Sequence, residues 1–195
     1  PYQDIAKCKN ACLNTAGLGG VYPSIQKARQ RKTDLFLNDR DEFMRQLVHD
    51  IHKFIRACDR KDKLPAIRLN GTSDIQWEKI DIDGQNIFEM FPQIQFYDYT
   101  KIPTRKVDKI PNYHLTWSYS EANEKYAEMF DQVPNNKAVV FRTKDLPSMF
   151  RGLKVIDGDT HDMRFLDKPN SVVGLKAKGQ AKKDYSGFVI DAIQI

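Results

Sequence analysis

Four aspartates in this chain stand where short β-type runs give way to polar clusters. They are Asp74, Asp98, Asp157 and Asp159. The carboxyl ends of parallel strands meet at one edge of a sheet, and the active sites of parallel α/β proteins lie at that edge. If the runs are parallel strands, the four carboxylates are expected to share one site.

Two carboxylates held close together can act as nucleophile and general acid–base, because their proximity separates their pKa values. We therefore predict Asp98 and Asp74 as catalytic residues. The same oxygens could instead bind Mg²⁺ or Mn²⁺, which prefer oxygen ligands. Aspartate is also a common turn or helix-cap residue after a strand, so each of the four has a structural interpretation as well.

Cationic, amide, hydroxyl and aromatic residues occupy comparable positions after the predicted strands. Together with two of the aspartates they form the predicted substrate-binding set: Asn70, Tyr99, Lys101, Ser118, Arg142, Asp157, Asp159, Lys176 and Lys178. The segment Gly174–Gly179 (GLKAKG) joins two lysines to flexible backbone, which suits a phosphate group. Aromatic rings among cations are typical of surfaces that stack bases. The net charge of +5 is compatible with a polyanionic partner.

The chain has three cysteines, an odd number that favours a reducing compartment over a disulfide framework. Cys8 and Cys12 are four residues apart, so a helix would place both thiolates on one face. We predict them as part of a zinc or iron–sulfur site, which needs three or four ligands. Cys58 falls on a hydrophobic helical stripe and is interpreted as a core residue.

Helices are predicted between residues 22 and 64. Pro23 or Ser24 begins the first helix, and Asn38 or Asp39 caps the second. The apolar residues of the second helix recur at spacings of three and four, which predicts one buried face.

After residue 65 the pattern changes to short apolar runs that end in polar residues. The predicted strands are Ala66–Leu69, Ile94–Tyr97, Tyr113–Tyr119, Lys137–Phe141, Leu153–Ile156, Ser171–Leu175 and Phe188–Ile190. The connection between the first two is long enough for a helical crossover between parallel strands. A short helix is predicted at Glu121–Phe130, and a short helix or turn at Leu146–Phe150.

These patterns predict a single α/β domain over residues 1–195. It consists of a cysteine-containing loop region (1–21), a helical region (22–64) and a β/α core (65–195). A compact or incomplete (β/α) barrel of the TIM type, with mostly parallel strands, fits the short connections best. A doubly wound sheet is the alternative. No apolar run approaches the roughly 18 residues of a membrane span, so no membrane association is expected.

Several segments of the chain form a recognisable set. They are CKNACLNTAG (Cys8–Gly17), RLNGTSD (Arg68–Asp74), FYDYTK (Phe96–Lys101), YHLTWS (Tyr113–Ser118), VIDGD (Val155–Asp159) and VVGLKAKG (Val172–Gly179). Together they resemble a family of small bacteriophage proteins. The resemblance implies that the protein works in the cytoplasm of the infected host cell.

The segment Phe96–Arg105 (FYDYTKIPTR) also resembles the nucleophile segment of tRNA-guanine transglycosylases, where an aspartate is followed shortly by Pro-Thr-Arg. The phage relatives of those enzymes, the DpdA-type 7-deazaguanine DNA transglycosylases, are (β/α) barrels that exchange guanine for a deazapurine. The resemblance implies that Asp98 attacks the sugar carbon and that Asp74 recognises the purine or moves a proton.

We therefore predict a phage enzyme that modifies nucleic acid, most specifically a DNA guanine transglycosylase that inserts a 7-deazaguanine. Its expected partners are DNA rather than RNA and a deazapurine substrate. One alternative is a metal-dependent phosphoryl-transfer enzyme or nuclease that uses the four aspartates. Another is a non-catalytic nucleic-acid-binding protein with zinc or an iron–sulfur cluster at its cysteines. The sequence leaves the oligomeric state open.

Overall fold

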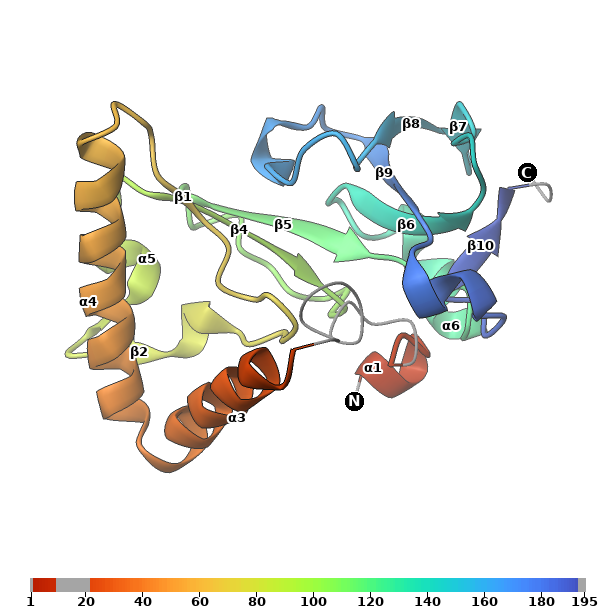
Figure 1. Cartoon of the computed structure of the whole chain (residues 1–195). Coiled ribbons are helices and arrows are strands. Elements are labelled where there is room, and N and C mark those ends of the chain that lie inside the picture. The colour runs from red at the N-terminus through yellow and green to blue at the C-terminus, as the bar shows by residue number, and fades with distance from the viewer. Residues whose placement is uncertain (1, 10–21, 193–195) are drawn as a thin grey trace.

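The computed structural model describes residues 2–9 and 22–192. Its main feature is one eight-stranded sheet (Figure 1). The strands are β1 (Ala66–Ile67), β4 (Gln95–Thr100), β5 (Tyr113–Ser118), β6 (Lys137–Arg142), β7 (Met149–Phe150), β8 (Leu153–Asp157), β9 (Ser171–Lys176) and β10 (Val189–Asp191). They lie in the order β1-β4-β5-β6-β9-β8-β7, and β10 pairs with β6.

The sheet is parallel apart from the pairing of β7 with β8, which confirms the prediction of mostly parallel strands. The prediction of a barrel is wrong, because the path of paired strands in the described part of the chain ends at β1 and β7. A barrel needs each new strand to extend the sheet in the same direction. Here β9 inserts between β6 and β8, so the direction of winding reverses and the sheet stays open.

The two faces of the sheet are covered differently. The helix face carries alternate residues of β4 and β5, including Phe96, Tyr113 and Leu115, and packs against α4 (Arg40–Asp59) and α5 (Ile87–Met90). Farther along the sheet the same face packs against α6 (Glu124–Ala127) and η3 (Glu128–Asp131). The loop face carries the intervening residues of β4 and β5, and it is covered by the segment 158–170, which contains η4 (Arg164–Leu166). This arrangement follows from right-handed crossovers, since strands added in opposite directions place their connections on opposite faces.

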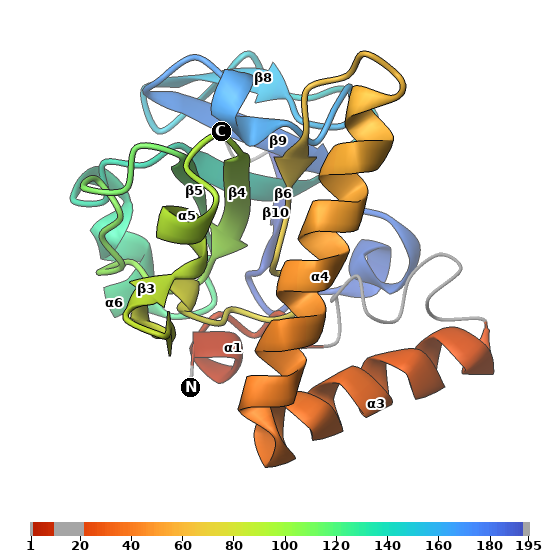
Figure 2. The same ribbon diagram turned by 90° about the vertical axis from the view of Figure 1, so that its left-hand side faces the viewer.

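Two long helices precede the sheet, as predicted. The N-terminal one, α3 (Pro23–Asn38), starts with proline at its first position, and α4 begins where the Asp39 carboxylate accepts the backbone N–H of Glu42 at 3.0 Å. Helix α4 buries Met44, Ile51 and Cys58, which confirms the apolar stripe. Helix α3 has no fully buried residue, although Phe36 packs against Phe43 and Trp77, and Figure 2 shows α3 running sideways from the lower end of α4.

The connection from β1 to β4 is more elaborate than the predicted crossover. It contains η2 (Trp77–Lys79), a two-stranded hairpin of β2 (Asp81–Ile82) and β3 (Gln85–Asn86), and then α5. The hairpin turns at Asp83 and Gly84, both with positive φ, which is the backbone that an Asp-Gly turn favours.

Two local predictions are corrected by the structure. The segment predicted as a helix or turn before Phe150 ends instead in β7, which pairs antiparallel with β8. Residues 1–21 were expected to be a loop, but α1 (Tyr2–Ile5) is a short helix, and residues 10–21 lie outside the described residues. None of the helices in the described ranges is both long and apolar enough to cross a membrane.

Candidate functional site

Asp98 lies inside β4 rather than after it, and its side chain is on the helix face with 0% exposure. Its carboxylate accepts the backbone N–H and the side-chain amide of Asn70 at 2.7 and 3.1 Å. It also accepts the hydroxyl of Tyr113 at 2.9 Å. The expectation that Asp98 sits at an open strand end is therefore wrong, because β4 continues to Thr100.

Asn70 organises the segment 70–78, which covers Asp98. While its amide nitrogen donates to Asp98, its carbonyl oxygen accepts the indole N–H of Trp77 at 3.1 Å and the backbone N–H of Ile75 at 3.0 Å. The hydroxyl of Ser73 donates to the same oxygen at 2.8 Å. One buried amide thus fixes the path of the segment relative to the strand below it.

Arg105 joins Asp98 to the other predicted catalytic carboxylate. Its buried guanidinium donates to both oxygens of Glu78 at 2.9 and 2.7 Å, to Asp74 at 3.0 Å and to the Tyr113 hydroxyl at 2.8 Å. Asp74 also accepts the backbone N–H of Lys101 at 2.6 Å. The structure therefore does bring Asp74 and Asp98 together, through Arg105 and Tyr113, into one buried polar network.

The electrostatics of this network are dominated by burial. Burial raises the pKa of Asp98 to about 6, although the hydrogen bonds from Asn70 and Tyr113 and the charge of Arg105 oppose the shift. Burial and the adjacent Asp98 likewise raise the pKa of Tyr113, which keeps its hydroxyl protonated as a donor. The arrangement provides a carboxyl group that can take up and release a proton close to neutral pH.

The other two aspartates do not join this network. Asp159 accepts the ammonium of Lys178 at 2.7 Å and the backbone N–H of Lys176 at 3.1 Å, and Asp157 lies 4.0 Å from the Lys176 ammonium. Within the described residues, no hydrogen bond or ion pair joins these aspartates to Asp74 or Asp98.

The register of the strands explains the separation. Trp117 near the end of β5 pairs with Lys137 at the start of β6, and Lys137 pairs with Val172 near the start of β9. The carboxyl ends of β4 and β5 therefore lie level with the amino ends of β6 and β9. The expectation that all strand ends share one rim is wrong for this reason.

The remaining predicted binding residues mostly hold parts of the chain together. The Lys101 ammonium donates to the carbonyl of Ser118 at 3.0 Å and lies 4.2 Å from the centre of the Phe188 ring. Arg142 donates to Asp191 and to the carbonyls of Lys182 and Asp184 at 2.6–2.7 Å. These donors are used inside the protein.

Tyr99 points to the opposite side of β4, onto the loop face. Its hydroxyl donates to Asp162 at 3.3 Å, and the Arg68 guanidinium lies 4.6 Å from its ring centre. Arg68 also pairs with Asp162 at 3.0 Å. Tyr99 is thus separated from Asp98 by the strand itself.

No three His, Cys, Asp or Glu side chains gather closely enough to hold a metal ion in residues 2–9 and 22–192. The four aspartates thus do not gather into one cluster, and metal-dependent phosphoryl transfer stays a prediction. Cys8 is half-buried, and Cys12 lies outside the described residues, so the zinc or iron–sulfur site at these cysteines stays a prediction.

The sequence interpretation missed Glu78, Tyr113 and Trp77 as members of the buried network, and it noticed Arg105 only through the Pro-Thr-Arg resemblance. A carboxylate or tyrosine carries no local signal for a partner 8–31 residues away. A usable signal would be two opposite charges, such as Asp74 and Arg105, in the segments that precede and follow an apolar strand, because such residues can pair across that strand.

Comparison with known proteins gives a match at the level of a protein family. No curated protein and no solved structure matches the chain, and nothing found supports the resemblance to transglycosylases. A family model described as gene product 88 matches residues 3–192, which confirms the resemblance to a bacteriophage family. Because the match spans nearly the whole sequence, the chain belongs to the gene product 88 family of phage proteins.

Proposed function

We propose that the protein binds nucleic acid, with DNA as the expected form, through a cationic surface formed by α3 and the segment 178–186. The observation that carries the proposal is the composition of α3. This helix of 16 residues buries none of them, yet it holds Lys27, Arg29, Arg31 and Lys32 against a single acidic residue, Asp34. A helix that has no fully buried residue and concentrates like charges is suited to an external polyanion.

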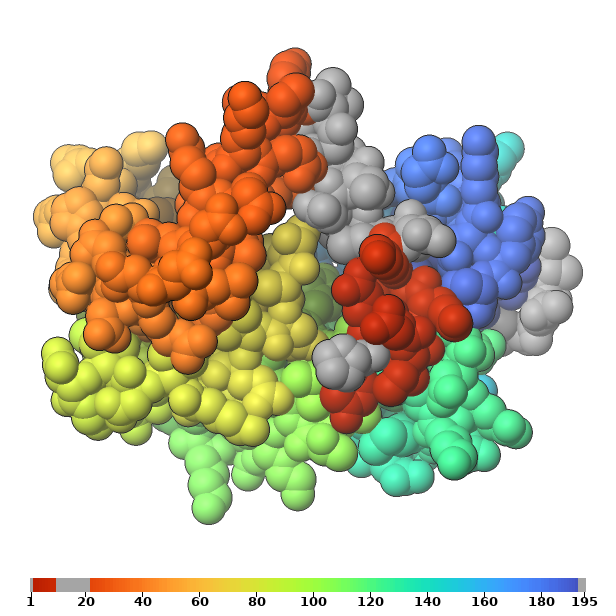
Figure 3. All heavy atoms as spheres, turned by 90° about the horizontal axis from the view of Figure 1, so that it is seen from below, coloured from red at the N-terminus to blue at the C-terminus, as the bar shows by residue number. Residues whose placement is uncertain are grey.

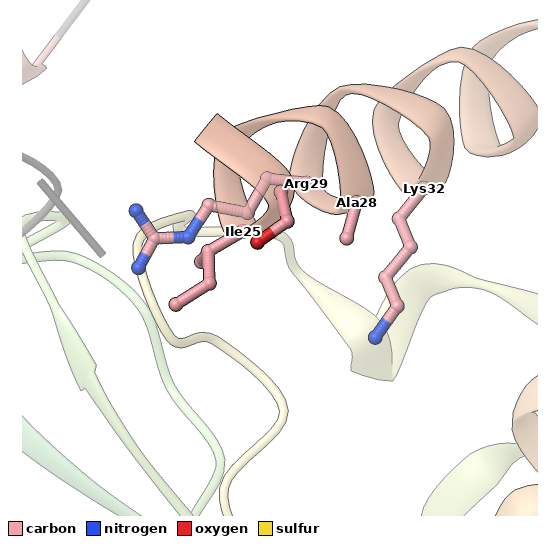
Figure 4. Close-up of a pocket in the computed structure, with 5 residues that line it drawn as sticks. Ile25, Ala28, Arg29 and Lys32 are labelled. Carbon is pink, nitrogen blue, oxygen red and sulfur yellow. The ribbon is translucent and has the colours of Figure 1, made fainter. Parts of the chain in front are cut away.

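A surface hollow lies along α3, next to these charged residues. It has a volume of about 370 Å³ and is lined by Ser24, Ile25, Ala28, Arg29 and Lys32. Figure 4 shows the side chains of Arg29 and Lys32 diverging, with the guanidinium extending past Ile25 and the ammonium lying on the other side of Ala28. The spacing of three and four residues explains why these side chains share one side. The Lys32 ammonium beside an apolar floor suits a phosphate next to a sugar or base.

The segment 178–186 supplies an exposed ring and further cations. It contains η5 (Gly179–Lys183), and the ring of Tyr185 is 80% exposed with the Arg142 guanidinium 4.0 Å from its centre. Because Arg142 holds the carbonyls of Lys182 and Asp184, it fixes the backbone from which Tyr185 projects. Exposed rings bind single strands by stacking, typically contributing roughly 1–3 kcal/mol per base. Figure 3 shows α3 and the C-terminal blue segment on the same face of the molecule.

Replacing Lys27, Arg31 and Lys32 together by glutamine should weaken binding to single-stranded DNA and make it less sensitive to salt. If each residue contacts one phosphate, the slope of log affinity against log salt should fall by about 2 for a single strand. Fluorescence anisotropy with a labelled oligonucleotide at several salt concentrations measures both quantities.

The matched control removes the same charge from the last part of α4 and the loop after it, through glutamine at Lys53, Lys61 and Lys63, which are also exposed. The control should retain most of the wild-type affinity and slope. Equal losses in the two variants would mean that only net charge matters, and the assignment of α3 would be wrong.

A second candidate, base exchange on DNA, is favoured by the pKa of Asp98, which burial raises to about 6. In that reaction an Asp98 oxygen bonds to the sugar carbon as guanine leaves with the bonding electrons, and the incoming deazapurine then displaces Asp98. Because the segment 70–78 covers the carboxylate, the reaction requires this segment to move. A further candidate, phosphoryl transfer through metal held by the four aspartates, has no such support.

Asp98→Asn should abolish incorporation of a labelled 7-deazaguanine into DNA, because an amide cannot form the glycosyl ester. The assay needs the wild-type protein, a DNA duplex and the labelled base, with nucleoside mass spectrometry as the readout. Absence of incorporation by the wild type, or equal incorporation by the variant, would remove this candidate.

A further inference from the structure

The ring of Tyr185 projects from the segment 178–186, and the residue is 80% exposed. Single exposed apolar side chains are common on protein surfaces, so exposure alone assigns no role to this ring. Tyr185 differs from such residues because hydrogen bonds fix the backbone on both sides of it and a cation covers one face of its ring. These contacts define what the ring can bind.

Arg142, the last residue of β6, fixes the backbone before Tyr185. Its Nη1 and Nη2 donate to the carbonyls of Lys182 and Asp184, both at 2.6 Å. Its Nε donates to the carboxylate of Asp191 at 2.7 Å, and Asp191 pairs with Arg142 in the register of β10 and β6. The guanidinium therefore ties the segment to the sheet.

The backbone after Tyr185 is held as well. The carboxylate of Asp184 accepts the backbone N–H of Val189 at 3.2 Å, which closes the chain into a turn that contains Tyr185. At Gly187, φ is +93°, a conformation that glycine adopts readily, and its carbonyl accepts the backbone N–H of Glu121 at 2.8 Å. A ring on a backbone held in this way loses little conformational freedom when a ligand binds.

One face of the ring is already occupied. The carbon at the centre of the Arg142 guanidinium lies over the ring of Tyr185, 4.0 Å from the ring centre, which is the geometry of a cation–π contact. The three hydrogen bonds that Arg142 donates keep the guanidinium in this position. Because 80% of the residue remains exposed, the opposite face of the ring is open.

We propose that the open face of Tyr185 stacks one unpaired base of a single-stranded nucleic acid, and that Arg142 is its positioning residue. The inference rests on the proposed nucleic-acid binding and names the chemical group that the segment 178–186 recognises. Lys182 and Lys183 are exposed and precede the ring by three and two residues, which suits the phosphates next to that base. A nucleotide combines the two features that this segment matches, a flat apolar face and an adjacent anion.

The covered face of the ring excludes bases within a duplex. Those bases are stacked on both sides, so a ring reaches them only by inserting between two of them. A ring that inserts fully contacts a base on each of its faces, and in Tyr185 the guanidinium of Arg142 occupies one of these. The ring should therefore add to the affinity for single strands and not to that for duplexes.

The first test is Tyr185→Leu, which removes the aromatic face and leaves the charge unchanged. Its affinity for a short oligothymidine should be about tenfold lower than that of the wild type, and its affinity for a duplex of the same length should be unchanged. Tyr185→Phe, which keeps the ring, should bind like the wild type. The matched control is Phe54→Leu, at a ring on α4 that is 42% exposed, which should change neither affinity. Fluorescence anisotropy with labelled oligonucleotides measures all of these affinities.

An oligonucleotide with the same sugar–phosphate chain but no bases separates stacking from charge. It should bind equally to the wild type and to Tyr185→Leu, because neither protein has a base to stack. A tenfold difference between the two proteins on this ligand would mean that Tyr185 contacts the backbone of the strand, and the assignment of a base to the ring would be wrong.

Arg142→Lys tests the positioning role. Lysine keeps the positive charge, but an ammonium cannot reproduce the planar set of bonds to two carbonyls and Asp191. The affinity for oligothymidine should fall about as much as in Tyr185→Leu, and the double variant should show no further loss. Additive losses would show that Arg142 acts independently of the ring and is not its positioning residue.

These measurements also separate the stacking site from the function on which it rests. If the wild type binds neither single strands nor duplexes, the proposed function is wrong and the stacking site with it. If the wild type binds oligothymidine and Tyr185→Leu binds it equally tightly, nucleic-acid binding stands and only the assignment of Tyr185 is wrong. Equal losses of affinity for single strand and duplex in Tyr185→Leu would also overturn this assignment.

Discussion

Replacing Arg105 by alanine should lower the free energy of unfolding by about 3–5 kcal/mol. The guanidinium is buried, and its removal leaves Glu78, with 10% of its side chain exposed, and Asp74, with 25%, facing each other without a cation. The Tyr113 hydroxyl loses a donor at the same time. The cost arises from these uncompensated buried groups rather than from the loss of attraction alone, so chemical denaturation at neutral pH should show the full effect.

The matched control is Arg45→Ala, which breaks an ion pair with Glu42 on the surface of α4. Its side chain is 67% exposed, so solvent screens the pair and the expected loss is at most about 1 kcal/mol. A loss of similar size in the two variants would show that the buried network does not hold the segment 70–78. Arg105→Lys should recover only part of the stability, because an ammonium cannot make the paired contact with Glu78.

The parts of the fold that the sequence predicted are those with a local physical cause. Asp39 caps α4 because its short side chain places the carboxylate within hydrogen-bond distance of a free backbone N–H in the first turn. The strands β5, β6, β8 and β9 were placed within about two residues because their apolar runs end at charged or turn-forming residues. Helix caps and strand ends depend on interactions among a few neighbouring residues, so they can be predicted from a sequence pattern.

The openness of the sheet could not be predicted in this way. It depends on β9 inserting between β6 and β8, and every strand involved has the same apolar character. A barrel and an open sheet differ in which neighbours pair, and apolar runs of equal length do not encode that choice. The register of β5 against β6 is a similar case, and it separated Asp157 and Asp159 from the predicted site.

The candidate site was predicted in part, for an identifiable reason. Asp74 and Asp98 were correctly predicted to lie in the same part of the fold. Asp74 follows β1, Asp98 is in β4, and these two strands are neighbours in the sheet. Their environment was not predicted, since the side chains that bury and bond them come from residues 70–113 and meet only in the folded protein. Arg164 is the strongest example, because a lone arginine in a polar loop has every local property of a surface residue, yet it is fully buried.

The second large effect concerns the dependence of stability on pH. Burial raises the pKa of Asp98 from 3.8 to about 6, so between these values the folded protein binds a proton that the unfolded chain has already released. The folded state is therefore favoured at low pH, and the contribution of Asp98 declines as pH rises through about 6. The total decline is roughly 3 kcal/mol, and about half of it falls between pH 5 and pH 7.

Asp98→Asn removes this titration, so the difference in unfolding free energy between wild type and variant should shift by roughly 1.5 kcal/mol between pH 5 and pH 7. Relative to the variant, the wild type should be more stable at pH 5 than at pH 7. Asp159→Asn is the control, because the hydrogen bonds from Lys178 and Lys176 outweigh burial and lower the pKa of that carboxyl. Its titration lies below the working range, so the corresponding difference should stay constant from pH 5 to pH 8. A constant difference for Asp98→Asn as well would mean that Asp98 is ionised throughout this range, held by Asn70 and Tyr113 as an ordinary structural carboxylate. Its proton would then be unavailable near neutral pH, and the support that the raised pKa gives to base exchange would disappear.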